Sequence, residues 1–204
     1  MKKFIIPSIL LLFVISGCSN DNEPDNSNKI NGHEYVDLGL SVKWATYNVG
    51  ATTPTGYGEY YKWGDIIPKG SDDSDPDIAK TSITEIAGTQ YDVAHVDWGS
   101  SWRMATETEW KELEEKCEWV WIENGEQSGY RVTGPNGNSI FLPACGIING
   151  DSLVETGTQA YYWTSTRCPG ESSYNAWGLH MGETYYGIGG WHISNGMAIR
   201  PVSN

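Results

Sequence analysis

The pattern of apolar and polar positions is most informative between residues 160 and 202. Two runs in this segment are typical of strands, Tyr161–Thr164 at its start and Met197–Val202 at its end. The residues between them are dense in Gly, Ser, Tyr, Trp, His and Asn. Such a mixture packs poorly as a core, but its aromatic rings and short polar side chains suit recognition. We therefore expect the earlier chain to be a scaffold that presents this stretch.

Alternating apolar and polar residues inside this segment indicate a further strand, from Tyr174 to Met181. The positions expected to face the interior are Trp177, Leu179 and Met181. Tyr174 and His180 are expected to face outward. Asn175 has the inward parity, but it stands at the start of the strand, where it can still reach solvent.

One helix is predicted after residue 105. Thr106 and Glu109 stand three residues apart, the spacing of a capping box in which each side chain satisfies the free backbone N–H of the other. The apolar face at helical spacing comprises Trp110, Leu113 and Cys117. Acidic residues cover the other faces, and Lys111 is placed to pair with Glu115 four residues later.

Short β-prone runs punctuated by turn residues make up most of the remaining chain. These runs are 35–40, 42–45, 60–63, 119–122, 130–133 and 139–142. The last two flank Asn136-Gly137, a strong signal for a hairpin.

Composition narrows the classes of partner. The chain has 12 Tyr and 10 Trp but only 3 Phe. Tyr and Trp carry a polar group, which suits half-buried surfaces as well as binding faces. The net charge of −13 comes without any basic stripe, so nucleic acid is not an expected partner.

The N-terminus reads as a targeting segment. A basic start at Met1-Lys2-Lys3 precedes an apolar run, 4–14, that is too short to span a bilayer. It leads into Ile15-Ser16-Gly17-Cys18, which resembles a bacterial lipobox, where the Cys is lipidated. The alternative is an ordinary secretory leader with an incidental Cys. We expect a signal peptide at 1–17, an acidic tether at 18–29 and one domain at 30–204.

Metal and thiol chemistry find little support in the sequence. The loop 68–77 carries Asp73, Asp75 and Asp77, but it lacks the Gly and the closing Glu of an EF-hand, so we expect an exposed acidic loop. Of the later cysteines, Cys145 pairs most naturally with Cys117 if any disulfide forms. Cys168 would then keep a free thiol, because the number is odd.

Several motifs, in order, resemble the Fibrobacter succinogenes major paralogous domain family. They are YVDLGLSVKWA at 35–45, NVGA at 48–51, WRMATETEW at 102–110, GPNGNSIFLPA at 134–144, YWTS at 162–165 and IRPV at 199–202. Ala105 stands where the family usually has Pro. The match spans most of the chain after the tether.

The resemblance implies an α+β, C-type lectin-like fold with short antiparallel sheets and one or two helices. Its termini would be neighbours, and a long, loop-rich C-terminal half would carry the binding face. Related members include the variable target proteins of diversity-generating retroelements. Their diversified residues lie between a Tyr-Trp strand and a C-terminal strand, the place that residues 167–195 occupy here. The Glu-Pro-Asn and Trp-Asn-Asp elements of calcium-dependent lectins are absent after residue 160. A calcium-bridged sugar site is therefore not expected.

The side chains expected to contact a ligand lie in this segment. They are Arg167, Tyr174, Asn175, His180, Tyr185, Tyr186, Trp191, His192 and Asn195. The alternative is that Trp191 and one of the two adjacent tyrosines fill the interior of a loop-rich fold.

The predicted function is that of a lipoprotein held at the outer membrane, exposed at the cell surface. It would bind a protein or glycan ligand without catalysis, cofactor or metal. One alternative is an oxidoreductase similar to formylglycine-generating enzymes, which share an Arg-x-x-Thr-x-x-Glu-Trp segment, matched by residues 103–110. Those enzymes need a late pair of reactive cysteines, whereas only Cys168 is late here. Another alternative is a structural component of a pilus or envelope.

Overall fold

Antiparallel sheets dominate the computed structural model, which describes residues 28–123, 127–170 and 174–204. Two α-helices and a short 3-10 helix, η1 (Asp77–Lys80), accompany the sheets within these ranges. The predicted α+β class, with antiparallel sheets and one or two helices, is therefore confirmed, and most of the regular structure is β. The signal peptide, Cys18 and all but the last two residues of the tether lie outside the described residues.

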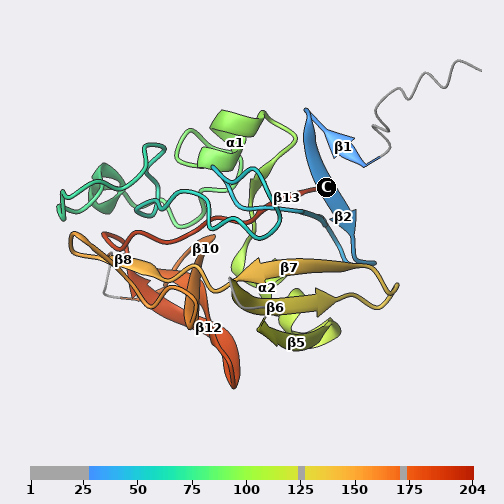
Figure 1. Ribbon diagram of the computed structural model, residues 1–204. Coiled ribbons are helices and arrows are strands. Elements are labelled where there is room, and N and C mark those ends of the chain that lie inside the picture. The colour runs from blue at the N-terminus through green and yellow to red at the C-terminus, as the bar shows by residue number, and fades with distance from the viewer. Residues whose placement is uncertain (1–27, 124–126, 171–173) are drawn as a thin grey trace, which may run out of the picture.

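The first sheet joins the two ends of the domain. Its strands are β1 (Lys29–Ile30), β2 (His33–Asp37), β3 (Lys43–Ala45), β4 (Arg103–Met104) and β13 (Pro201–Ser203). They lie in the order β1-β2-β3-β13-β4, so the last strand of the chain is inserted between β3 and β4. Val202 pairs with Trp44 on one side and with Arg103 on the other. The C-terminus, marked in Figure 1, therefore lies in the same sheet as β2, from which β3 separates it.

Two further sheets are meanders of three strands. One consists of β5 (Glu118–Glu123), β6 (Ser128–Thr133) and β7 (Ser139–Pro143). The other consists of β10 (Gln159–Arg167), β11 (Asn175–Gly182) and β12 (Tyr185–His192). The hairpin expected at Asn136-Gly137 is confirmed, since it connects β6 and β7, and Gly137 has a φ of 87°. A two-stranded ribbon, β8 (Ile147–Asn149) and β9 (Ser152–Val154), lies between these sheets in sequence.

The expected helix is α2 (Glu107–Lys116), and both hydrogen bonds of its capping box form. Trp110 and Leu113 are buried beneath it. The predicted pairing of Lys111 is wrong, because its ammonium lies 2.6 Å from the carboxylate of Glu107, one turn earlier. Both pairs have the i,i+4 spacing, but a Glu that precedes the Lys is the more favourable orientation, and the first-turn glutamate also complements the helix N-terminus.

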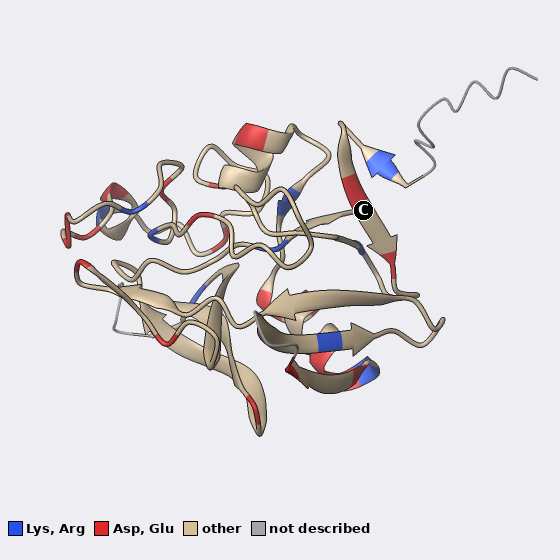
Figure 2. Ribbon diagram, viewed as in Figure 1, with Lys and Arg blue, Asp and Glu red and all other residues tan. Residues whose placement is uncertain are grey.

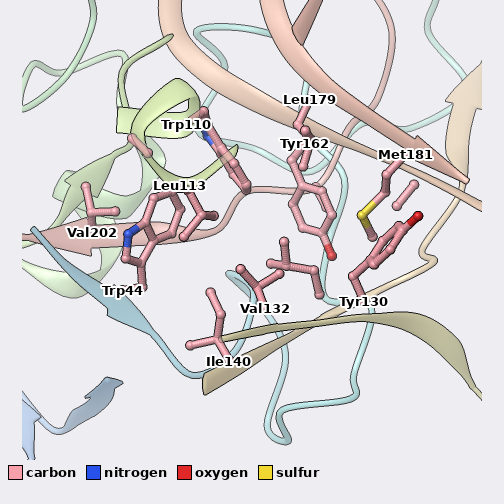
Figure 3. Packing of buried hydrophobic residues seen from close by; sticks show 14 of the residues in the cluster. Trp44, Trp110, Leu113, Tyr130, Val132, Ile140, Tyr162, Leu179, Met181 and Val202 are labelled. Atoms are coloured by element: carbon pink, nitrogen blue, oxygen red, sulfur yellow. The ribbon is translucent and has the colours of Figure 1, made fainter. Parts of the chain in front are cut away.

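The core has two clusters of buried side chains. In the first, shown in Figure 3, Trp44 and Trp110 meet edge to face at 4.8 Å, and Tyr162 lies 5.7 Å from Trp110. The second cluster gathers around Trp63, Trp102 and Trp163. The two clusters lie against opposite faces of the β10–β12 sheet, because Tyr162 belongs to one and Trp163 to the other.

Two expected strands are only partly regular. Residues 60–63 form no strand. Instead, Tyr61 bridges Met197, and the N–H of Trp63 donates to the carbonyl of Ile193. The strand expected from Met197 begins only at Pro201, because the preceding residues bond singly to several different segments. Cys117, Cys145 and Cys168 are all free thiols.

A missed element is α1 (Val93–Trp98), in which the Asp92 carboxylate caps the N–H of His95. Neither helix in the described ranges is long and apolar enough to cross a bilayer.

Candidate functional site

The register of β10 and β11 creates a stacked pair of rings. Tyr161 and His180 are direct cross-strand partners. Their rings lie nearly parallel, 10° apart in orientation, with centroids 4.4 Å apart. Pairs that face each other across antiparallel strands have close Cβ atoms, so the register alone brings these rings together.

Trp191 extends this ring cluster from β12. Its partner across the ladder is Ala176, but its indole lies 5.2 Å from the His180 ring and 4.8 Å from the Tyr161 ring. Two glycines leave room for this position. A Cβ on Gly178 would lie 3.0 Å from Trp191 Cδ1, and one on Gly189 would lie 3.6 Å from Trp191 Nε1. The indole therefore lies along the sheet, and its Nε1 is buried without an acceptor among the described residues.

Polar groups line the same end of the sheet. The amide oxygen of Gln159 accepts a hydrogen bond from Tyr185 Oη at 2.6 Å and lies 2.6 Å from His180 Nε2. Tyr185 Oη is also 3.0 Å from that nitrogen. Tyr161 Oη donates to the carboxylate of Glu155 at 2.6 Å. We name this group the His180 cluster. It comprises Glu155, Gln159, Tyr161, His180, Tyr185 and Trp191.

The charge states in the His180 cluster follow from partial burial. Burial lowers the pKa of His180, and the nearby Glu155 carboxylate opposes that shift only in part. The imidazole is therefore neutral at pH 7. Burial, followed by the hydrogen bond to Glu155, raises the pKa of Tyr161, so this phenol stays protonated. The cluster thus presents neutral rings, hydroxyls, an amide and one carboxylate, which are groups that bind polar ligands.

Glu155 sits at a constrained backbone position. Its φ is +62°, in the left-handed region that residues other than Gly and Asn rarely adopt. Its carbonyl accepts from the N–H of Thr158 and of Gln159, at 3.2 and 2.9 Å, which holds the turn into β10. Strained residues often occur at sites where a side chain must be aimed. Here the turn aims the carboxylate at Tyr161.

A second group lies at the other end of β12. Tyr174 and His192 have parallel rings with centroids 6.0 Å apart. His192 Nδ1 lies 2.9 Å from Ser194 Oγ and 3.8 Å from the carboxylate of Asp75. We name these four residues the His192 cluster. The acidic loop before η1 therefore contacts this end of the sheet in addition to facing solvent; Figure 2 shows its red positions beside the β8–β12 region.

Most of the expected ligand contacts fall in or beside the two clusters. Tyr174 and Tyr185 are about half exposed, at 46% and 44%. Asn175 is half-buried and pairs with His192 in the ladder. Asn195 is half-buried in the following turn, where its N–H donates to the carbonyl of His192. His180, expected to face outward, is half-buried because Tyr161 covers one face of its ring.

Two predicted contacts do not belong to this surface. Arg167 is only 6% exposed, and its guanidinium donates to the carbonyls of Thr81 and Ile78. It is held inside because a guanidinium satisfies several carbonyls at once. Tyr186 points to the opposite face of the sheet, where it stacks on Trp119 at 4.4 Å. One of the two adjacent tyrosines therefore packs against the scaffold, as the alternative reading foresaw.

Glu155, Gln159 and Asp75 belong to the two clusters but are not among the contacts expected from the sequence. The sequence pattern indicates only an exposed acidic loop around Asp75. Gln159 could have been found from the alternation of β10, since it lies two residues before Tyr161 and shares its face. The contact between Glu155 and Tyr161 depends on the left-handed turn, for which Glu is not a signal residue.

The residues that the oxidoreductase alternative singled out, Cys168 and the segment 103–110, lie outside the two clusters. Burial, with a smaller contribution from Glu107, raises the pKa of the Cys168 thiol to about 11, so it is protonated at pH 7. Arg103 makes two hydrogen bonds to Glu109, at 2.8 and 2.6 Å, and thereby fixes the start of α2. Within the described ranges, no group of three His, Cys, Asp or Glu is placed to hold a metal ion.

Compared with models of known protein families, with curated proteins and with solved structures, the chain matched none.

Proposed function

We propose that the protein is a non-catalytic binding module with a C-type lectin-like fold, which recognises a protein or glycan ligand through the His180 cluster. The observation that carries the proposal is the co-location of the Tyr161, His180 and Trp191 rings with the half-exposed Tyr185, an amide and a carboxylate at one end of the β10–β12 sheet. Aromatic faces with converging hydrogen-bond groups are typical of recognition surfaces.

The fold assignment rests on three features. The termini meet in one sheet, because β13 pairs with β3. The helix α2 packs against the β10–β12 sheet through Trp110. The C-terminal half supplies the surface that the resemblance to the Fibrobacter succinogenes family would assign to binding. The resemblance of 15–18 to a lipobox, with the acidic run that follows Cys18, supports a location at the outer face of the outer membrane, anchored through lipid on Cys18.

The ligand can be sought with arrays. The purified full chain would be applied to glycan and protein arrays, together with Tyr185→Ala and Trp191→Ala. Loss of one aromatic contact should weaken binding by about tenfold or more. The control is Ile67→Ala, which removes an apolar side chain that is 74% exposed and belongs to neither cluster. If both cluster variants bind as the parent does, the proposed surface is wrong.

The alternatives predict other outcomes. An oxidoreductase should lose turnover in Cys168→Ser, whereas a binding module should keep its ligand. A structural envelope component should copurify with one fixed partner, and that interaction should persist in Tyr185→Ala. Anchoring can be measured separately, since Cys18→Ser should abolish incorporation of a labelled fatty acid and release the protein from membranes.

A further inference from the structure

The outer face of the β5–β7 sheet carries apolar residues where polar ones are expected. Alternate side chains of β6 and β7 face the core. They include Tyr130, Val132 and Leu142, each nearly or fully buried. The opposite face should then meet solvent and be polar. Instead it carries Ile122 and Phe141, both half-buried. Apolar groups on the solvent side of an antiparallel sheet indicate a binding surface when they line a concavity.

A groove of about 380 Å³ lies over this face. Its apolar lining includes Val36, Pro54, Ile122 and Phe141. The Phe141 ring lies close to Gly129 of β6, where an added Cβ would be 2.9 Å from Phe141 Cζ. The volume lies within the range of about 300–1,000 Å³ that is usual for sites of small molecules.

Arg131 stands on β6 in the lining of this groove and is directly paired with Phe141. In Figure 2 it is the blue band on β6, the only Lys or Arg of that strand. Every other Lys or Arg in the described ranges contacts a carboxylate, a carbonyl or an aromatic ring. These are Lys29, Lys43, Lys62, Lys69, Lys80, Arg103, Lys111, Lys116, Arg167 and Arg200. Arg131 alone has no such partner among the described residues.

An unpaired guanidinium is unexpected on a chain with a net charge of −13. Carboxylates are abundant, yet none in the described ranges pairs with Arg131. The Arg131 side chain is exposed, so its donors are open to a ligand in the groove, and a hydrogen bond from a charged donor is roughly twice as strong as one from a neutral donor. A planar fork of donors fits a carboxylate in two-point geometry. The hydroxyl groups of Thr55 and Ser139 in the same lining supply further polar contacts.

We propose that this groove binds a small organic acid, with its apolar body against Ile122 and Phe141 and its carboxylate on Arg131. The site is separate from the His180 cluster, since the two share no residue, and it stands whether or not that cluster binds a macromolecule.

The test uses 4-phenylbutyrate as the probe, with 4-phenylbutan-1-amine as the matched cation of the same apolar body. Saturation-transfer NMR would follow both probes with the full chain in lipid nanodiscs, and empty nanodiscs would give the background. We expect the acid to bind in the micromolar to millimolar range and the amine to give no signal. Arg131→Gln, which keeps a long polar side chain, should weaken the acid by at least about tenfold.

Two further variants complete the design. Ile122→Ser should weaken the acid severalfold, because it removes apolar contact from the groove wall. Lys80→Gln removes an exposed positive charge elsewhere and should leave binding unchanged. The proposal is overturned if 4-phenylbutyrate gives no signal above empty nanodiscs, if Arg131→Gln binds as the parent does, or if the amine binds as well as the acid.

Discussion

Replacing a residue by Gly usually destabilises a protein more than replacing it by Ala. At Glu155, where the backbone is left-handed, we expect the opposite. A residue with a side chain costs roughly 1–2 kcal/mol in this region, whereas Gly does not. Gly loses more chain entropy on folding, which opposes this gain by roughly 0.5–1 kcal/mol. At a φ of +62° the first effect wins. We therefore expect Glu155→Gly to be more stable than Glu155→Ala by about 0.5–1 kcal/mol.

The comparison isolates the backbone, because both variants lose the same carboxylate and the same hydrogen bond from Tyr161. Thermal unfolding would measure it, with an expected difference of about 1–4 °C for a domain of this size. The matched control is Ser152 in β9, an exposed position that is not among those with positive φ. At this position Ser152→Ala should be more stable than Ser152→Gly. If Glu155→Ala is as stable as Glu155→Gly or more stable, the stability cost assigned to the left-handed backbone is wrong.

Three other predictions concern the core, α2 and the His180 cluster. Arg200→Met should lower the free energy of unfolding in urea by roughly 3–5 kcal/mol, because three buried oxygens lose their donor; unchanged stability would contradict it. Thr106→Ala should cost about 1 kcal/mol by thermal melting, through loss of the cap, whereas the exposed Thr108→Ala should stay within about 0.5 kcal/mol. His180 has a folded pKa below its unfolded value of 6.5, so protonation favours the unfolded chain. Its contribution to stability should be lost as the pH falls below about 6.5, and His180→Gln should flatten that decline in denaturant unfolding between pH 7.5 and 5.

Local chemistry made part of the fold predictable. The capping box before α2, the Asn-Gly hairpin and the alternation of β10 and β11 each depend on residues close in sequence. The helix α1 has local signals too, Asp92 before it and Gly99 after it. It is only one turn and a half long, so its apolar periodicity is too short to detect. Residues 60–63 are β-prone, but their partners near 193–197 lie far along the chain.

The candidate site shows the same division. Alternation correctly grouped Leu179 with Met181, both fully buried in the core. It also put His180 on the other face, but parity does not show that Tyr161 covers the ring. Arg167 looked like a surface cation, because nothing in its own neighbourhood shows the carbonyls that bind it from more than eighty residues away. Contacts of that separation are set by tertiary packing and not by local pattern.

The insertion of β13 between β3 and β4 has a consequence for the growing chain. Strands near residues 43 and 103 are synthesised long before their shared neighbour at 201–203 exists. Until that neighbour arrives, each has an open edge of backbone donors and acceptors, which is a template for pairing with another molecule. A nascent or truncated chain that stops short of Pro201 should therefore aggregate more readily than one that includes β13.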